Sequence, residues 1–243
     1  DKSTAYAEQY NQPGVFTSVI GFEWSSSSNG NNLHRVVMFR DGADRARQVI
    51  PFATFDSDDP EDLWDWMERY QEDTGGRVLA AAHNGNWGTG LMFADERNNG
   101  APLDAAYAAK RIRFEPIYEM TQIKGDSETH PLLSPDDAWA DFGTWDKGDL
   151  GGRNRITPEM LPHQYARSAL RLGLGHEANL GTNPFKFGMI GSTDAHTTLA
   201  TTREDNFFGK NPPAEPDMNR WSHVFMKGEL EGTDYYNWET LAS

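Results

Sequence analysis

The chain has 243 residues, of which 37% are hydrophobic, and carries a formal net charge of −15 at pH 7. This length suits one α/β domain with a large core, and the negative charge argues against a nucleic-acid partner because phosphates would be repelled. The absence of cysteine excludes disulfides and thiolate metal sites, so cysteine usage indicates no redox compartment.

No apolar run is long enough to span a membrane, and no signal peptide opens the chain. The first residues resemble the interior of a domain, so we expect any signal peptide to lie upstream. The sequence does not distinguish the periplasm from the cytoplasm of a bacterium, and it does not indicate an oligomeric state.

The first part of the chain predicts two neighbouring strands. Residues 15–22 form an apolar, β-branched run that delivers Glu23 at its end, and residues 33–39 form a second run. A polar loop over residues 25–32 separates the two runs. Alternation along the second strand places His34 on one of its faces. We therefore expect a hairpin with Glu23 and His34 close to its mouth.

A strand–helix–strand unit follows. Asp58 or Asp59 caps a helix over residues 60–74, where proline comes first and a glycine pair stops the helix. Residues 77–82 then predict a strand that ends at His83. A single histidine at a strand end is usually structural, because buried polar groups normally find a partner.

The second half of the chain alternates further helices and strands. We expect helices over residues 103–110, 134–142 and 157–175, and strands over residues 112–120 and 187–191. The last strand is expected to be buried, because it is an apolar run bounded by glycine. It delivers Asp194 and His196.

Candidate metal ligands therefore follow several separate strands. Glu23, His83, Asp194 and His196 each come at or just after the end of one, and in an α/β barrel such ends converge on one face. Carboxylates and imidazoles are ligands of Mn²⁺, Zn²⁺ and Fe²⁺, and water bound to such an ion becomes a nucleophile near neutral pH. These four side chains are the predicted catalytic metal site.

Further candidate ligands are less specific. His34, Glu119 and Glu128 have suitable side chains, and the last of these lies in the polar segment 121–130 together with His130. A solvated loop explains that segment equally well. An isolated Asp-x-His tripeptide is also usually a cap or a turn, so only its combination with the other strand ends favours a metal site.

Several stretches resemble the PHP (polymerase and histidinol phosphatase) superfamily of metal-dependent phosphoesterases, and more closely a bacterial family of long-unassigned function within or near it. The resemblance implies a distorted TIM-like α/β barrel, with Glu23 as a bridging carboxylate and His83, Asp194 and His196 as ligands. The matching stretches are Gly21–Trp24, Ala82–Asn86, Gln122–Glu128, Asn183–His196 and Asn206–Lys210.

One feature departs from that pattern. PHP-like domains begin with a His-x-His strand that supplies much of the metal site, and this chain contains no His-x-His. The resemblance thus implies that residues 1–243 are an internal part of a single PHP-like domain, without that strand and without the C-terminal continuation. We expect these residues alone to bind metal weakly and to lack turnover.

The predicted activity is hydrolysis of a small anionic ester, with a phosphoester as the first choice, at a site of two or three divalent ions. Lys124, Arg203 and Lys210 are candidates to neutralise the substrate, although exposed surface charge explains each of them equally well. Trp87, like Trp24, either stacks on a substrate ring or packs at the rim. Sulfate-ester or amide hydrolysis would suit the same scaffold.

A non-catalytic module that binds carbohydrate or calcium is the alternative from another class. Its support is the many tryptophan and tyrosine residues and the acidic surface. A calcium site built from carboxylates would have no need of His83 and His196. Substitution of these histidines therefore distinguishes the two hypotheses.

Overall fold

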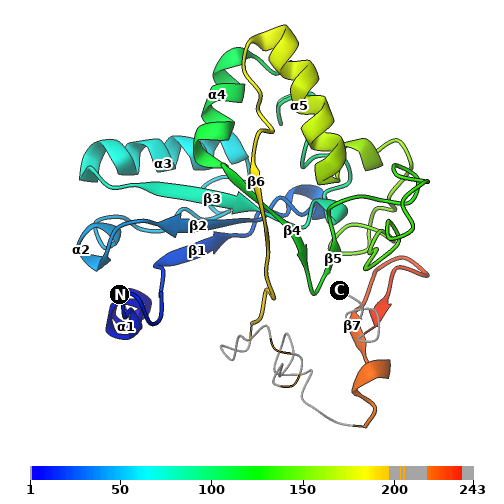
Figure 1. The fold of residues 1–243 in the computed structure, drawn as a ribbon, viewed down its shortest axis with the longest axis horizontal. Helices are drawn as coiled ribbons and strands as arrows, with labels where there is room; N and C mark the ends of the chain where they lie inside the picture. Colours follow the sequence, from blue (N-terminus) through cyan, green and yellow to red (C-terminus); the bar gives the residue numbers. More distant parts are fainter. Residues whose placement is uncertain (1, 197–202, 204, 206–217, 237–243) are drawn as a thin grey trace.

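A computed structural model describes residues 2–196, 203, 205 and 218–236 of the chain, and its ribbon is shown in Figure 1. Six strands form the main sheet: β1 (Gly21–Trp24), β2 (Arg35–Phe39), β3 (Val78–Ala82), β4 (Ile117–Gln122), β5 (Gly125–Asp126) and β6 (Gly188–Gly191). The α-helices are α1 (Lys2–Tyr10), α2 (Ala43–Ala46), α3 (Pro60–Thr74), α4 (Ala105–Phe114) and α5 (Ala166–Leu180). Strands β7 (Val224–Met226) and β8 (Tyr235–Tyr236) pair separately as an antiparallel ribbon.

The main sheet is open and mixed, so the prediction of a TIM-like barrel was wrong. β1 pairs with β2, β2 with β3, and β4 with β5 in antiparallel fashion, whereas β4 pairs in parallel with β3 and β6. A barrel of the TIM kind needs parallel strands that close on themselves. Here the chain reverses direction at β2, and among the described residues β1 and β6 pair with a strand on one side only.

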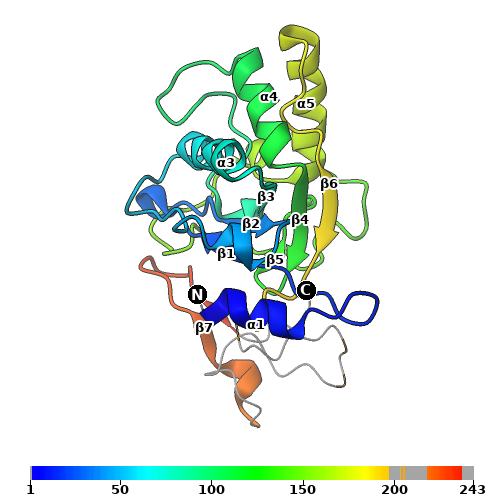
Figure 2. The same ribbon diagram turned by 90° about the vertical axis from the view of Figure 1, so that its left-hand side faces the viewer.

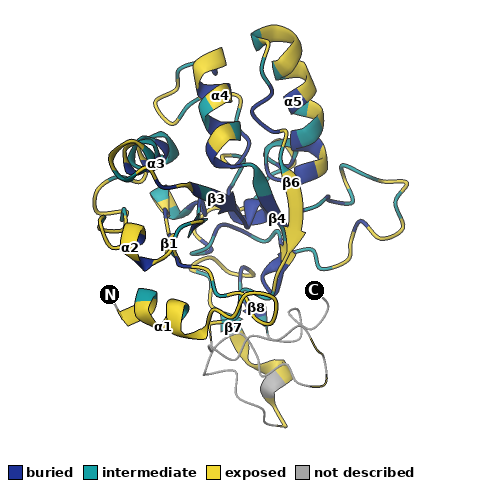
Figure 3. Cartoon of the chain, turned by 60° about the vertical axis from the view of Figure 1, so that its left-hand side comes forward, coloured by how far each residue is buried: buried dark blue, intermediate teal, exposed yellow. Residues whose placement is uncertain are grey.

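The two faces of the sheet differ. Helices α3, α4 and α5 lie on one face, while α1 and the β7–β8 ribbon lie on the opposite side (Figure 2). The sheet residues that face the helices include the buried Val37 and Ala80 and the partly buried Phe22, and they pack in one cluster with Trp64 and Met67 of α3. Figure 3 shows the burial concentrated between the sheet and these helices.

Helix α3 forms where its end signals predict it. The Asp59 carboxylate accepts a hydrogen bond from the Glu61 backbone N–H at 2.9 Å, Pro60 occupies the first turn, and Gly75 ends the helix in the left-handed conformation with φ 66°. The cap is therefore Asp59 of the two candidates.

Other predicted boundaries were wrong. β1 begins at Gly21 rather than residue 15, and β4 begins at Ile117 rather than residue 112, because α4 continues to Phe114. Helix α5 begins at Ala166, not residue 157.

Two further expectations fail because side chains stay outside the core. Residues 134–142 form turns instead of a helix, and Trp139 and Phe142 are exposed there, so no apolar face stabilises a helix. β6 is exposed along its whole length, although its apolar sequence predicted a buried strand.

A fully buried ion-pair network joins the sheet to the helices. The Glu115 carboxylate accepts hydrogen bonds from Arg35 Nε at 2.9 Å and from the Trp64 indole at 2.8 Å, and Arg111 Nε lies 3.5 Å away. Burial alone would raise the pKa of Glu115, but the two guanidinium groups outweigh it and lower that pKa. The network thus holds one carboxylate ionised between two cations.

Replacing Glu115 should strongly destabilise the fold. In Glu115→Gln the Arg35 and Arg111 charges remain buried without a counter-charge, so we expect a loss of about 3–5 kcal/mol in the free energy of unfolding at pH 7. Denaturant titration measures it. The matched control is Glu229→Gln, which removes an exposed ion pair with Arg153 and should leave the stability almost unchanged. Equal stability of both variants would contradict the role of the network.

Candidate metal centre

Three candidate ligands lie on one face of the sheet because of its strand register. Glu23 of β1 pairs with Val36 of β2, and Val36 pairs with Ala81 of β3. His34 lies two positions before Val36, and His83 two positions after Ala81, so both keep the same face. The backbone N–H of His83 donates to the His34 carbonyl, at an N–O distance of 3.4 Å, and extends this ladder. Antiparallel pairing therefore brings the end of β1, the start of β2 and the end of β3 to one edge.

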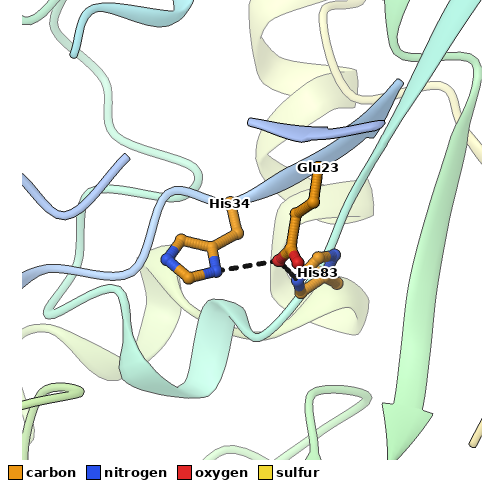
Figure 4. A group of neighbouring side chains, drawn as sticks. All are labelled: Glu23, His34 and His83. Carbon is orange, nitrogen blue, oxygen red and sulfur yellow. Dashed lines mark hydrogen bonds and ion pairs between the residues drawn. The ribbon is translucent and has the colours of Figure 1, made fainter. Parts of the chain in front are cut away.

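The three side chains meet at the Glu23 carboxylate. Its Oε1 atom lies 3.0 Å from His34 Nδ1 and 3.1 Å from His83 Nε2, as the dashed lines in Figure 4 show. One possible ligand atom from each residue lies within 4.8 Å of those from the other two. Glu23, His34 and His83 thus form a possible metal-binding triad, and we use the word triad for these residues below.

The electrostatics of the triad favour the ligand forms of its side chains. Burial would raise the pKa of Glu23, but hydrogen bonds from His34 and His83 outweigh that effect and hold this pKa well below its usual range. Burial lowers the pKa of His34 against the opposing influence of Glu23. An ionised carboxylate and a neutral imidazole are the forms that bind metal ions.

A second polar cluster contains the predicted ligands at the end of β6. Asp194 forms an ion pair with Lys124 and, through Oδ1, a hydrogen bond of 3.0 Å with His196 Nε2. Lys124 is buried, with 9% of its side chain exposed, and its charge lowers the pKa of His34. The cluster therefore lies within electrostatic reach of the triad.

The four predicted catalytic residues are divided between these two groups. Glu23 and His83 join His34, whereas Asp194 and His196 gather around Lys124. Within the described ranges, only the triad brings three His, Asp or Glu side chains close enough for one ion to bind all of them.

The remaining candidate ligands lie in other contacts. The Glu119 carboxylate accepts a hydrogen bond from the Ser192 hydroxyl. Glu119 also pairs with Ile190 of β6, the strand that precedes Asp194. Glu128 forms an ion pair with Arg167 at 2.6 Å, and His130 contacts Asp146 at 2.8 Å.

The candidate substrate-binding residues differ in accessibility. Trp87 is fully buried and stacks on Trp145 with ring centroids 5.6 Å apart, so it packs within the fold rather than presenting a ring face to solvent. Arg203 is exposed and pairs with Asp205, and Lys210 lies outside the described residues. Lys124 is the candidate cation beside the triad.

Sequence reasoning missed two polar residues of the site, Asn84 and Gln122. Both are buried, and Gln122 Nε2 donates to Asn84 Oδ1 at 2.8 Å and to Glu119 Oε2 at 3.4 Å. The available signal was the position of Asn84 directly after His83 at a strand end. Its left-handed backbone, with φ 52°, appears only in the structure.

Comparison with known proteins gives one match. The model of a family described as "Protein of unknown function (DUF3604)" matches residues 1–243. No curated protein matches the chain, and no solved structure does. The resemblance to PHP phosphoesterases therefore stays a prediction. Separately, no helix in the described part of the chain has both the length and the apolar character needed to cross a membrane.

The lowered pKa of Glu23 gives a pH-dependent prediction. Since the folded-state pKa lies below the ordinary value of 4.5, the stabilisation by this carboxylate is fully present above pH 4.5 and is lost as the pH falls. Glu23→Gln should lower the free energy of unfolding by about 1–3 kcal/mol at pH 7, and the difference should shrink toward pH 3. Denaturant titrations across this range measure it. The exposed Glu72→Gln variant is the control, and a pH-independent difference would contradict the assignment.

Proposed function

The chain belongs to the DUF3604 family, and we propose that it is a metal-dependent hydrolase of a small anionic ester, with a phosphoester as the first choice. The observation that carries this proposal is the triad, in which one ionised carboxylate and two imidazoles converge on one point. A hydrophobic core has no need of such a group, and burial of the two imidazoles costs free energy unless they are paired or bind an ion.

The donor set of the triad fits a transition metal. Two imidazole nitrogens and one carboxylate oxygen are the ligands of catalytic sites that keep an open position, and Zn²⁺, Mn²⁺ and Fe²⁺ accept them. When bound by Glu23, His34 and His83, the ion would supply a Lewis acid that polarises the ester and lowers the pKa of water.

The neighbouring cluster would bind and orient the ester. The Lys124 ammonium is buried next to the triad and can neutralise a phosphate oxygen. Asp194 accepts a hydrogen bond from His196 Nε2, which orients this imidazole beside the Lys124–Asp194 ion pair. These residues therefore place a cation and an oriented imidazole near the triad.

We also propose that a second ion uses Asp194 and His196, as in a site of two or three ions. Asp194 is neutralised by Lys124 in this structure, so an ion bound to this carboxylate would displace the ammonium. Lys124 would then be available to the substrate anion, whose negative charge would offset the positive charge added by the ion.

The two histidines of the triad distinguish this proposal from a calcium-binding module. Calcium prefers oxygen ligands and does not require imidazole. Sulfate-ester and amide hydrolysis remain alternatives on the same site, because a metal and a cation beside it would serve each of them.

Metal binding tests the site directly. We expect the chain to bind Mn²⁺ or Zn²⁺ and the His34→Ala/His83→Ala double variant to bind at least about tenfold more weakly, because two ligands are lost. Calorimetric titration measures affinity, and elemental analysis measures content. His223→Ala removes an exposed histidine and is the matched control. Absence of transition-metal binding, or unchanged metal affinity and content in the double variant, would contradict the proposal, and binding of Ca²⁺ alone would support the module.

Substrate class requires a second experiment. Aryl phosphate, aryl sulfate and anilide substrates are compared with the metal-loaded chain and its Glu23→Gln variant. Phosphate-selective turnover that the variant abolishes would establish a phosphoesterase, and it would contradict the expectation that these residues alone are inactive. Selective turnover of sulfate or anilide would assign the corresponding alternative.

A further inference from the structure

Asn84 is a buried polar residue with an unusual conformation beside the triad. It follows His83 directly, its side chain is almost fully buried at 1% exposure, and its backbone is left-handed with φ 52° and ψ 44°. A residue other than glycine holds such a conformation at an energetic cost, and such residues occur often at functional sites.

The surrounding hydrogen bonds fix the orientation of the Asn84 amide. The Lys124 backbone N–H can only donate, and it donates to Gln122 Oε1 at 2.9 Å. Gln122 Nε2 is therefore the donor toward Asn84, at 2.8 Å, so the Asn84 atom facing it must be the acceptor Oδ1. These assignments make Asn84 Nδ2 the group of the amide that points away from Gln122.

Asn84 Nδ2 is buried and has no hydrogen-bond partner among the residues that the structure describes. Asn86, two positions later, is a buried asparagine whose amide has hydrogen-bond partners at both its nitrogen and its oxygen. Its Nδ2 donates to the Lys124 carbonyl at 3.1 Å and to the Trp145 carbonyl at 3.0 Å, and its Oδ1 accepts from Ser127. A buried donor without a partner is uncommon in native proteins and requires an explanation.

We propose that Asn84 is a ligand-binding residue whose Nδ2 group donates a hydrogen bond to an oxygen of the anionic ester or of the product phosphate. The inference rests on the proposed function. Asn84 directly follows His83 of the triad in the chain, and Gln122 connects its amide to Glu119 and to the backbone of Lys124. Phosphate oxygens accept hydrogen bonds and donate none when ionised, and a fixed neutral donor binds them without adding charge.

Inorganic phosphate is the probe, and Asn84→Gly is the first variant. Glycine adopts the left-handed backbone without strain, so the fold and the metal content should stay unchanged while the amide donor is lost. We expect calorimetry to show phosphate affinity about tenfold to a hundredfold lower, as for loss of a hydrogen bond to a charged group. Asn29→Gly is the matched control, because Asn29 is exposed and has φ 53°, and its phosphate affinity should equal that of the wild type.

A second variant keeps the shape of the side chain. Asn84→Asp replaces the donor by an oxygen, so phosphate affinity should fall at least as far as in Asn84→Gly, and the two variants together guard against misfolding of one. Phosphate affinity equal to wild type in a folded variant, or no phosphate binding by the wild type, would overturn the proposal. Titrations with and without Mn²⁺, together with metal content, separate this failure from failure of the metal site. If the wild type binds phosphate through Asn84 but binds no transition metal, the anion site stands and the proposed hydrolase fails.

Discussion

The register of the antiparallel strands β1, β2 and β3 is the constraint on which the site depends. A shift by one residue would move His34 or His83 to the helix-covered face of the sheet, because side chains alternate along a strand. Glu23 then would lose the hydrogen bonds at 3.0 and 3.1 Å that hold it ionised. The opposite face specifies this register, since Val37 belongs to the hydrophobic core cluster there and Phe22 packs against that cluster.

The buried ion-pair network holds the start of β2 in place from the helix-covered face of the sheet. Arg35 follows His34, donates to the Leu33 carbonyl, and pairs with Glu115 at the C-terminus of α4. Charges removed from water in this way contribute little net stability, but they penalise any arrangement that separates them. The core thus positions the backbone on both sides of His34. Interactions that do not involve the triad side chains therefore hold His34 in place.

Two clusters of charge, each partly compensated, lie next to each other at this edge of the sheet. The triad concentrates negative charge between imidazoles, and Lys124 balances Asp194. Such an arrangement suits the proposed function, in which the negative charge of the substrate would offset the positive charge of the bound ions. The protein as a whole carries a formal charge of −15, so attraction of the proposed anionic substrate would depend on these local positive groups and not on the overall field.

The sequence by itself determined the residue types of the site and several elements around it. The hairpin with Glu23 and His34 at its mouth, helix α3 with its Asp59 cap, and His83 at the end of β3 follow from local signals: alternation, proline and glycine positions, and strand ends. Only the tertiary structure decided that the sheet is open, that Asp194 contacts Lys124, and that β6 and residues 134–142 stay outside the core. Strand direction, ion-pair choice and burial depend on contacts between segments distant in sequence, and local periodicity carries no information about them.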